Sequence, residues 1–211
     1  MSITKKKPKA RPARQRRSPE EVRRRALESA RSLLAANGPT AITLKAVADD
    51  LGMTHTNLIH HFGSAGELQS ALMREMVREL TLTIEGAMAR SSAGEVNRRQ
   101  FVDLVFDAFD QGGAGRLAAW IVMSGNARLL APVGQVVREY VTNVEQTIAL
   151  HSRDPKLHER VTSSLLLVTL AALGDAIIGD TLRKMVERDR DALREIITNL
   201  LYTIHGEASK P

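Results

Sequence analysis

The sequence predicts an all-α protein in which a small N-terminal three-helix domain precedes a larger helical domain. Apolar residues recur at three- and four-residue spacing through most of the 211 residues, which places them on one face of a helix. Residues that favour helix N-caps precede several of these segments, and glycine or proline follows them. Strand signals are nearly absent, because β-branched residues do not gather into alternating apolar and polar runs.

The chain begins with a basic segment whose cations exceed the whole formal charge surplus of +6. The rest of the chain is therefore slightly acidic. A basic tail on a near-neutral protein indicates binding to a polyanion, with nucleic acid favoured over an anionic membrane surface. The alternative is a solvated terminus that only aids solubility. We expect residues 1–18 to form a basic, disordered arm, with these cations: Lys5, Lys6, Lys7, Lys9, Arg11, Arg14, Arg16 and Arg17.

Composition excludes several classes of protein and site. The chain has no cysteine, which rules out disulfides, zinc fingers and thiol nucleophiles and suits a cytoplasmic location. No apolar stretch follows the N-terminal charges, so a secretory signal is not expected. The most apolar run, residues 161–174, has 14 residues and falls short of the roughly 18 that a membrane span needs. We expect no membrane partner.

Capping residues divide the N-terminal third into helices. Ser18 and Pro19 predict a helix over 19–36, which Gly38 ends. Thr43 caps the next short helix, which ends at Gly52, and Thr54 caps another that runs to about residue 61. Only residues 51–53 separate these two, which is typical of a helix-turn-helix. Ser64 then caps a long helix that runs to about residue 89.

The remaining sequence predicts five further helices. Asp154-Pro155 indicates one start, and Gly112-Gly113 and Gly125-Asn126 indicate breaks. The expected helices span about 95–110, 114–124, 132–151, 156–186 and 189–205.

The short helix after Thr54 carries the chemistry of base recognition. Helical geometry turns Leu58 and Phe62 toward the core and Thr56, Asn57 and His60 outward. Hydroxyl, amide and imidazole groups of this kind can reach base edges in a major groove. At the margin of that face, His55 can donate to a phosphate or base and Ile59 can contact a thymine methyl.

Residues 43–62, TLKAVADDLGMTHTNLIHHF, resemble the DNA-binding domain of TetR-family regulators, and the resemblance extends over about residues 19–72. It implies a homodimer whose two recognition helices, residues 54–60, enter successive major grooves. It also implies a C-terminal domain that binds an effector. Ile59 replaces a common tyrosine and Ala65 a common lysine, which weakens the usual phosphate clamp. The candidate DNA contacts are Thr43, Lys45, Thr54, His55, Thr56, Asn57, Ile59, His60, Ser64, Arg14, Arg16 and Arg17.

Five of the seven aromatic residues lie between positions 101 and 140. They either line a pocket for a small apolar effector or simply fill the helical core, and the sequence leaves both readings open. The candidate pocket residues are Phe106, Phe109, Trp120, Met123, Tyr140 and Asn143.

The last two long helices are apolar over a wide arc, which requires cover on more than one side. Pairing with a second copy as a four-helix interface supplies that cover, and burial within one chain is the alternative. The resemblance favours the dimer. The candidate interface residues are Leu165, Thr169, Ala172, Ile177, Ile197 and Leu201.

Metal and enzyme sites are not expected. His55, His60 and His61 diverge around their helix, and no carboxylate completes a ligand set. Neither a nucleophile elbow nor a phosphate loop is present, so we expect no catalytic residues and no cofactor.

These observations predict a DNA-binding domain over 19–66 and an effector-binding and dimerisation domain over 67–211. The expected function is sequence-specific repression at a palindromic operator, relieved by a small molecule. The alternative is a DNA-bound adaptor that recruits proteins and has no small-molecule ligand.

Overall fold

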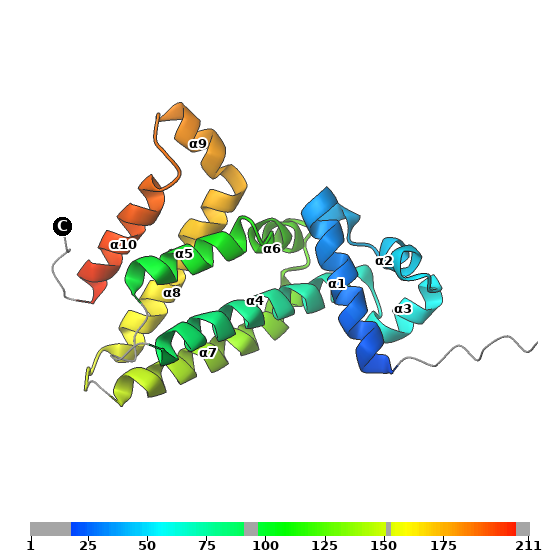
Figure 1. Cartoon of the computed structure of the whole chain (residues 1–211), viewed down its shortest axis with the longest axis horizontal. Helices are drawn as coiled ribbons and strands as arrows, with labels where there is room; N and C mark the ends of the chain where they lie inside the picture. The colour runs from blue at the N-terminus through cyan, green and yellow to red at the C-terminus, as the bar shows by residue number, and fades with distance from the viewer. Residues whose placement is uncertain (1–17, 91–96, 151–152, 206–211) are drawn as a thin grey trace, which may run out of the picture.

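The computed structural model describes residues 18–90, 97–150 and 153–205, which contain helices, turns and loops and no strand. The expected all-α fold is confirmed, and Figure 1 shows the helices in two parts joined by α4. The elements are α1 (Pro19–Asn37), η1 (Pro39–Ala41), α2 (Leu44–Leu51), α3 (His55–Phe62), α4 (Ala65–Ala89), α5 (Arg98–Phe109), α6 (Ala114–Met123), η2 (Ala127–Leu130), α7 (Ala131–Ala149), α8 (Leu157–Gly174), η3 (Asp175–Gly179), α9 (Asp180–Met185) and α10 (Ala192–Ile204).

The four N-caps expected in the first third of the chain are all confirmed. The hydroxyl oxygens of Ser18, Thr43, Thr54 and Ser64 each accept a hydrogen bond from the backbone amide three residues later, at 3.1 to 3.3 Å. Gly52 ends α2 with a φ of +61°, a left-handed conformation that glycine adopts without strain. The start of α1 and both ends of α2 are therefore specified locally.

Two hydrophobic cores lie one after the other along α4. The first joins α1, α2, α3 and the first half of α4, and it also includes Leu117 and Ile121 of α6. The second joins the far half of α4 with α5, α7, α8 and α10. The expected division at residue 66 falls in the first turn of α4, so the head (residues 19–66) and the body (residues 67–205) share this helix and part of a core.

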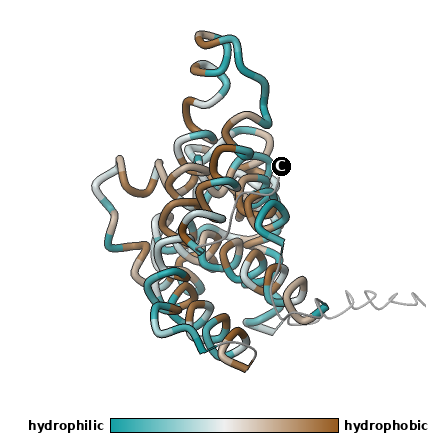
Figure 2. Tube along the Cα trace, turned by 90° about the vertical axis from the view of Figure 1, so that its left-hand side faces the viewer, coloured by the Kyte–Doolittle hydropathy of each residue, from teal (hydrophilic) through white to brown (hydrophobic). Residues whose placement is uncertain are grey.

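The C-terminal helices differ from the single helix expected over 156–186. The helical run changes to a π-helix at η3, between α8 and α9. In this wider turn Asp175 lies against Gly179, and Arg183 pairs with both Asp175 and Asp180. Beyond η3, α9 and the segment that joins it to α10 project from the body (Figures 1 and 2).

The run Leu157–Met185 is 29 residues long and is apolar enough to cross a membrane by length and composition alone. Its α8 portion also packs within the second core, where Val161, Val168 and Ala172 are buried. Core helices of soluble proteins meet the same criterion, so the run is weak evidence for a membrane span.

Ion pairs hold α10 against α5. Arg194 is only 7% exposed and donates to Asp103 at 3.0 Å and to Asp107 at 2.7 Å. Its guanidinium also lies 5.2 Å from the centre of the Phe106 ring. One arginine of α10 thus joins two acids and one ring of α5 across the second core.

We predict that Arg194→Ala lowers the free energy of unfolding by about 1–2 kcal/mol, because charge-assisted hydrogen bonds are lost but both acids can still be solvated. Urea unfolding followed by circular dichroism at fixed protein concentration measures the change. Arg190→Ala is the matched control, since Arg190 and its partner Asp110 are both exposed, and its effect should stay within about 0.5 kcal/mol. Equal midpoints for the two variants would contradict a stabilising role for Arg194.

Candidate nucleic-acid interface and internal cavity

The α3 helix presents one buried and one exposed face. Leu58 and Phe62 are buried in the first core, as the helical spacing predicts. On the opposite face Thr56, Asn57 and His60 are exposed. The chemistry of that face, a hydroxyl, an amide and an imidazole, fits hydrogen bonding to base edges.

The margin of this face carries His55, which is exposed, and Ile59, which is 39% exposed. Thr54 begins the helix and is exposed as well. An exposed isoleucine beside polar groups offers an apolar contact of the kind that a thymine methyl accepts.

Helix starts surround this face with groups suited to phosphates. Thr43 and Lys45 at the start of α2 and Ser64 before α4 are all exposed. Each cap hydroxyl accepts a bond through its oxygen, so its own hydrogen can still be donated to a phosphate. Helix N-termini also favour anions through their free amides.

Arg23 of α1 holds the end of α3, a contact that the sequence analysis missed. Its guanidinium stacks 4.5 Å from the centre of the Phe62 ring and donates to the carbonyl oxygen of His61. Gln69 of α4, which is buried, donates to the carbonyl oxygen of Ile42 at 3.1 Å. Both contacts join residues far apart in sequence, and local spacing gives no signal for them.

The arm residues Arg14, Arg16 and Arg17, which were expected to contact DNA, lie outside the described residues.

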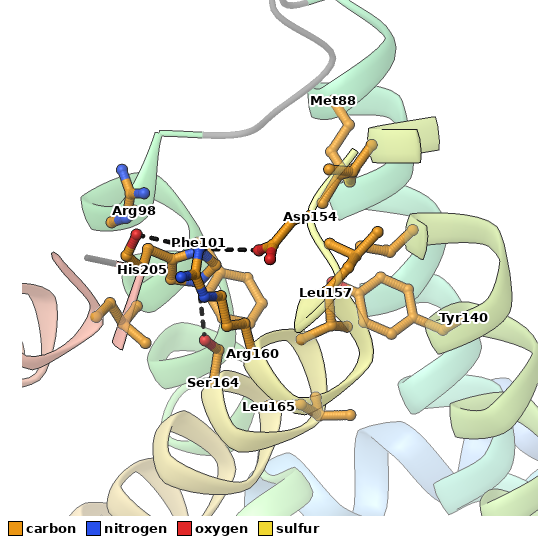
Figure 3. A pocket seen from close by; sticks show the side chains of 14 residues that line it. Met88, Arg98, Phe101, Tyr140, Asp154, Leu157, Arg160, Ser164, Leu165 and His205 are labelled. Carbon is orange, nitrogen blue, oxygen red and sulfur yellow. Dashed lines mark hydrogen bonds and ion pairs between the residues drawn. The ribbon is translucent and has the colours of Figure 1, made fainter. Parts of the chain in front are cut away.

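A cavity of about 220 Å³ that is partly open to solvent lies in the second core, at the end of the body away from the head. Side chains of α4, α5, α7, α8 and α10 converge on it (Figure 3). Its lining residues are Met88, Arg98, Phe101, Tyr140, Val144, Ile148, Asp154, Leu157, Arg160, Val161, Ser164, Leu165, Leu201 and His205.

Polar groups gather on one side of this cavity (Figure 3). Arg160 pairs with Asp154, with Nη1 at 2.8 Å from Oδ2, and the same nitrogen donates to the carbonyl oxygen of His205 at 3.3 Å. Oγ of Ser164 lies 3.1 Å from Nε2 of His205. On the other side, burial and the nearby Glu85 carboxylate raise the pKa of Tyr140, so its hydroxyl stays protonated.

The expected pocket residues mostly lie elsewhere, and only Tyr140 lines the cavity. Phe106 and Phe109 fill the second core, which was the alternative reading. Trp120 and Met123 face outward at 37% and 85% exposure. Asn143 is exposed and donates to Glu85 at 3.0 Å. Aromatic content alone could not identify the cavity, because Phe101 and Tyr140 are the only Phe, Tyr or Trp among its described lining residues, which come from five helices.

The expected dimer residues divide between two faces. Ala172, Ile197 and Leu201 are buried within the chain's own second core, so a partner cannot contact them in this structure. Leu165 and Thr169 are half-buried, and Ile177 is exposed. Periodicity gave the spacing of the apolar positions but not which of them face outward.

The apolar residues that are exposed on α8, η3, α9 and α10 form what we call the C-terminal patch. Figure 2 shows brown, hydrophobic segments on the part that projects from the body. The patch comprises Leu166, Leu170, Ile177, Ile178, Leu182, Met185, Ile196 and Leu200.

Comparison with known proteins agrees with this geometry. Residues 26–72 match the family described as bacterial regulatory proteins, tetR family. They include all of the helix-turn-helix and lie within the range of the resemblance seen in the sequence. No curated protein matches the sequence.

Solved structures with the same fold include several regulators. A TetR-family transcriptional regulator from Streptomyces coelicolor is 16% identical with a TM-score of 0.62, covering 92% of each chain. A TetR-family regulator from Mesorhizobium loti is 11% identical with a TM-score of 0.64, covering 90% of this chain and 98% of its own. A transcriptional regulator from Saccharomonospora viridis, in complex with choline, is 15% identical with a TM-score of 0.57. The alignment covers 90% of this chain and 100% of that regulator.

These similarities reach beyond the head, since each structure aligns with about nine-tenths of the chain. The family match rests on the helix-turn-helix, and the shared fold includes the body. Residues 26–72 therefore carry the DNA-binding domain of the tetR family of bacterial regulatory proteins, and the chain as a whole has the fold of solved TetR-family regulators.

Proposed function

We propose that this protein is a DNA-binding transcriptional regulator, a repressor that binds a palindromic operator as a homodimer and leaves it when a small molecule fills the cavity. The observation that carries the proposal is α4, a single helix that begins beside the recognition helix and ends at the cavity. It has 25 residues, and a helix of that length spans about 37 Å. A ligand that moves the far end of a stiff helix also moves the near end.

Contacts between the body and the start of α4 support this coupling. Ser70 of α4 donates to the carbonyl oxygen of Leu129 at 2.5 Å. A Cβ added to Gly66 would lie 2.7 Å from Cδ1 of Leu129, so η2 packs directly against the first turns of α4. A shift of α6 or η2 would therefore reach the head through this contact as well as through α4.

Dimerisation is proposed through the C-terminal patch. Leu166 and Leu170 of α8 and Ile196 and Leu200 of α10 are exposed and lie on the two helices that the sequence analysis selected. Leu170 and Ile196 line one hollow together with Ile178 and Leu182, and exposed apolar residues that group in this way indicate a protein partner. A second copy of the chain covers these apolar residues with its own patch, so the same patch is used on both subunits, as a two-fold axis requires.

We assign sequence reading to residues 19–66, effector binding and dimerisation to residues 67–211, and added affinity to the basic arm. The cytoplasm is the location that this function requires. The regulator from Saccharomonospora viridis was solved with choline, which supports a small-molecule role for this fold and leaves the ligand of this chain open.

A DNA-bound adaptor is the second candidate, and one surface favours it. Trp120, Val122 and Met123 of α6 are exposed and lie outside the C-terminal patch. They offer a contact for another protein that dimerisation through α8 and α10 would leave accessible.

Selection of bound sequences from a random duplex pool tests the proposal. The full chain should be compared with a chain that lacks residues 1–17. Enrichment of a two-fold symmetric motif by both chains supports a specific dimeric regulator in which the arm adds affinity. If neither chain enriches a motif, the recognition-helix assignment is wrong and the adaptor is favoured.

We predict that Asn57→Ala weakens binding to the selected motif by roughly 5- to 150-fold, because an amide can pair with two groups of one base. Lys45→Ala should instead weaken binding to all sequences and reduce the log–log salt slope by about 1, since it removes a phosphate contact. Fluorescence anisotropy over a salt series measures both. Lys156→Ala, an exposed lysine at the start of α8, is the control and should change neither quantity. A salt slope altered by Asn57→Ala alone would contradict these roles.

We predict that Leu170→Glu produces monomers in sedimentation velocity, because it places a charge in the proposed interface at a residue that is 58% exposed in the single chain. Operator affinity should fall by about tenfold or more, since the second half-site no longer binds within the same complex. Leu82→Glu on α4, at a similarly exposed leucine, is the matched control and should stay dimeric. A dimeric Leu170→Glu variant would place the interface elsewhere.

A further inference from the structure

We propose that the cavity binds a small organic acid, a monocarboxylate with an apolar body, and that Arg160 binds its carboxylate. This rests on the proposed function only in treating the cavity as the effector site. The inference is drawn from the shape, bonding and charge of the lining.

The cavity has two chemically distinct sides. Tyr140, Val144 and Ile148 of α7 form a wall of one ring and two branched side chains. Opposite them lie Arg160 and Ser164 of α8 (Figure 3). A pocket that is mostly apolar with a few converging polar groups fixes the orientation of an amphiphilic ligand.

The guanidinium of Arg160 is only partly used by its protein partners. Both its bond to Asp154 and its bond to the carbonyl oxygen of His205 come from Nη1. Among the residues that the structure describes, Nε and Nη2 have no hydrogen-bond partner, and the side chain is 32% exposed. These two nitrogens form one edge of a planar fork that matches the two oxygens of a carboxylate.

A second donor stands beside this edge. Oγ of Ser164 and Nε2 of His205 are 3.1 Å apart, and Arg160 and Ser164 are separated by one helical turn, so their side chains share a face of α8. The Ser164 hydroxyl can turn from His205 to the ligand without backbone movement. Carboxylate oxygens accept several hydrogen bonds, and these groups supply them.

The charges of the described lining also favour an anion. Arg98 and Arg160 are cations, and Asp154 is the only acid among the lining residues. Asp154 is already paired with Arg160, so an ammonium group on the ligand would find no free carboxylate there. Opposite charge in a partly desolvated site adds to affinity, and like charge subtracts from it.

Isothermal titration calorimetry on the full chain without DNA tests the class of ligand. The probes are octanoate, 1-octanol and octyltrimethylammonium at pH 7.5, which share one apolar chain and differ in head-group charge. We expect octanoate to bind at least about tenfold more tightly than 1-octanol, as charge-assisted bonds imply, and the ammonium most weakly. Tightest binding by the ammonium or the alcohol would overturn the proposal, as would no binding by any probe.

Variants separate a role in ligand binding from a role in packing. Asp154→Asn removes the competing charge but keeps an oxygen that can accept from the Lys156 amide, as Asp154 does at 2.9 Å. Asp154→Asn should strengthen octanoate binding several-fold and leave the dissociation constant of 1-octanol within twofold of its original value. Arg160→Gln should weaken octanoate binding by about tenfold or more and again leave 1-octanol binding within twofold. Parallel losses for both probes would show that these residues only shape the cavity.

Arg153→Gln is the matched control, because Arg153 is exposed and does not line the cavity. It removes one positive charge close to Arg160 in sequence, so octanoate binding should stay within twofold. An effect equal to that of Arg160→Gln would indicate a diffuse charge effect and overturn the assignment to Arg160.

Failure of this proposal is distinguishable from failure of the proposed function. Anisotropy of a labelled operator during octanoate titration measures release from DNA separately from binding to the cavity. Octanoate that binds without releasing DNA supports the anion site and contradicts effector-controlled repression. Specific operator binding by a chain that binds none of the probes overturns the anion site and leaves the DNA-binding role intact.

Discussion

The structure depends on α4 belonging to both hydrophobic cores. Leu68 and Leu72 near its start are buried with α1 to α3, while Ile84 and Met88 near its end are buried with α5 and α7. Apolar burial at both ends fixes the helix against two sets of partners. A reorientation of the head would therefore disturb packing in the body too, which is the coupling that the proposed effector control requires.

Polar contacts join the start of α4 to the head and to η2. Gln69 and Ser70 are both buried, and each bonds to a backbone carbonyl of another element: Ile42 of the head and Leu129 of η2. Buried hydrogen bonds are costly to leave unmade, so α4 carries the loop before α2 and η2 with it as a unit. At the far end Glu85 accepts a hydrogen bond from Asn143 of α7 on the exposed side, while Met88 lines the cavity with a flexible side chain that can adjust to a ligand at low cost.

Most helix boundaries could be predicted because residues next to each boundary specify it. Ser18, Thr43, Thr54 and Ser64 specify helix starts within four residues of sequence, and the structure shows each cap bond. The π-helix at η3 could not be predicted, since it depends on how Arg183 folds back on Asp175. The outward face of α3 was predictable because Leu58 and Phe62, four residues apart, share one face of a two-turn helix, and burying both turns Thr56, Asn57 and His60 outward. The cavity was not, because five helices separated in sequence build it.

The dimer prediction illustrates the limit of periodicity. On α8 and α10 apolar residues occur around most of the helix, so spacing alone cannot distinguish the face that packs within the chain from the face that meets a partner. Val168 and Leu201 are buried, whereas Leu170 and Leu200, close by in sequence, are exposed. What distinguishes them is the position of α5, which Arg194 holds against α10 through Asp103 and Asp107. The ion pairs that close the second core thus also select which apolar residues remain for a second subunit, and the proposed dimer surface follows from the internal packing of one chain.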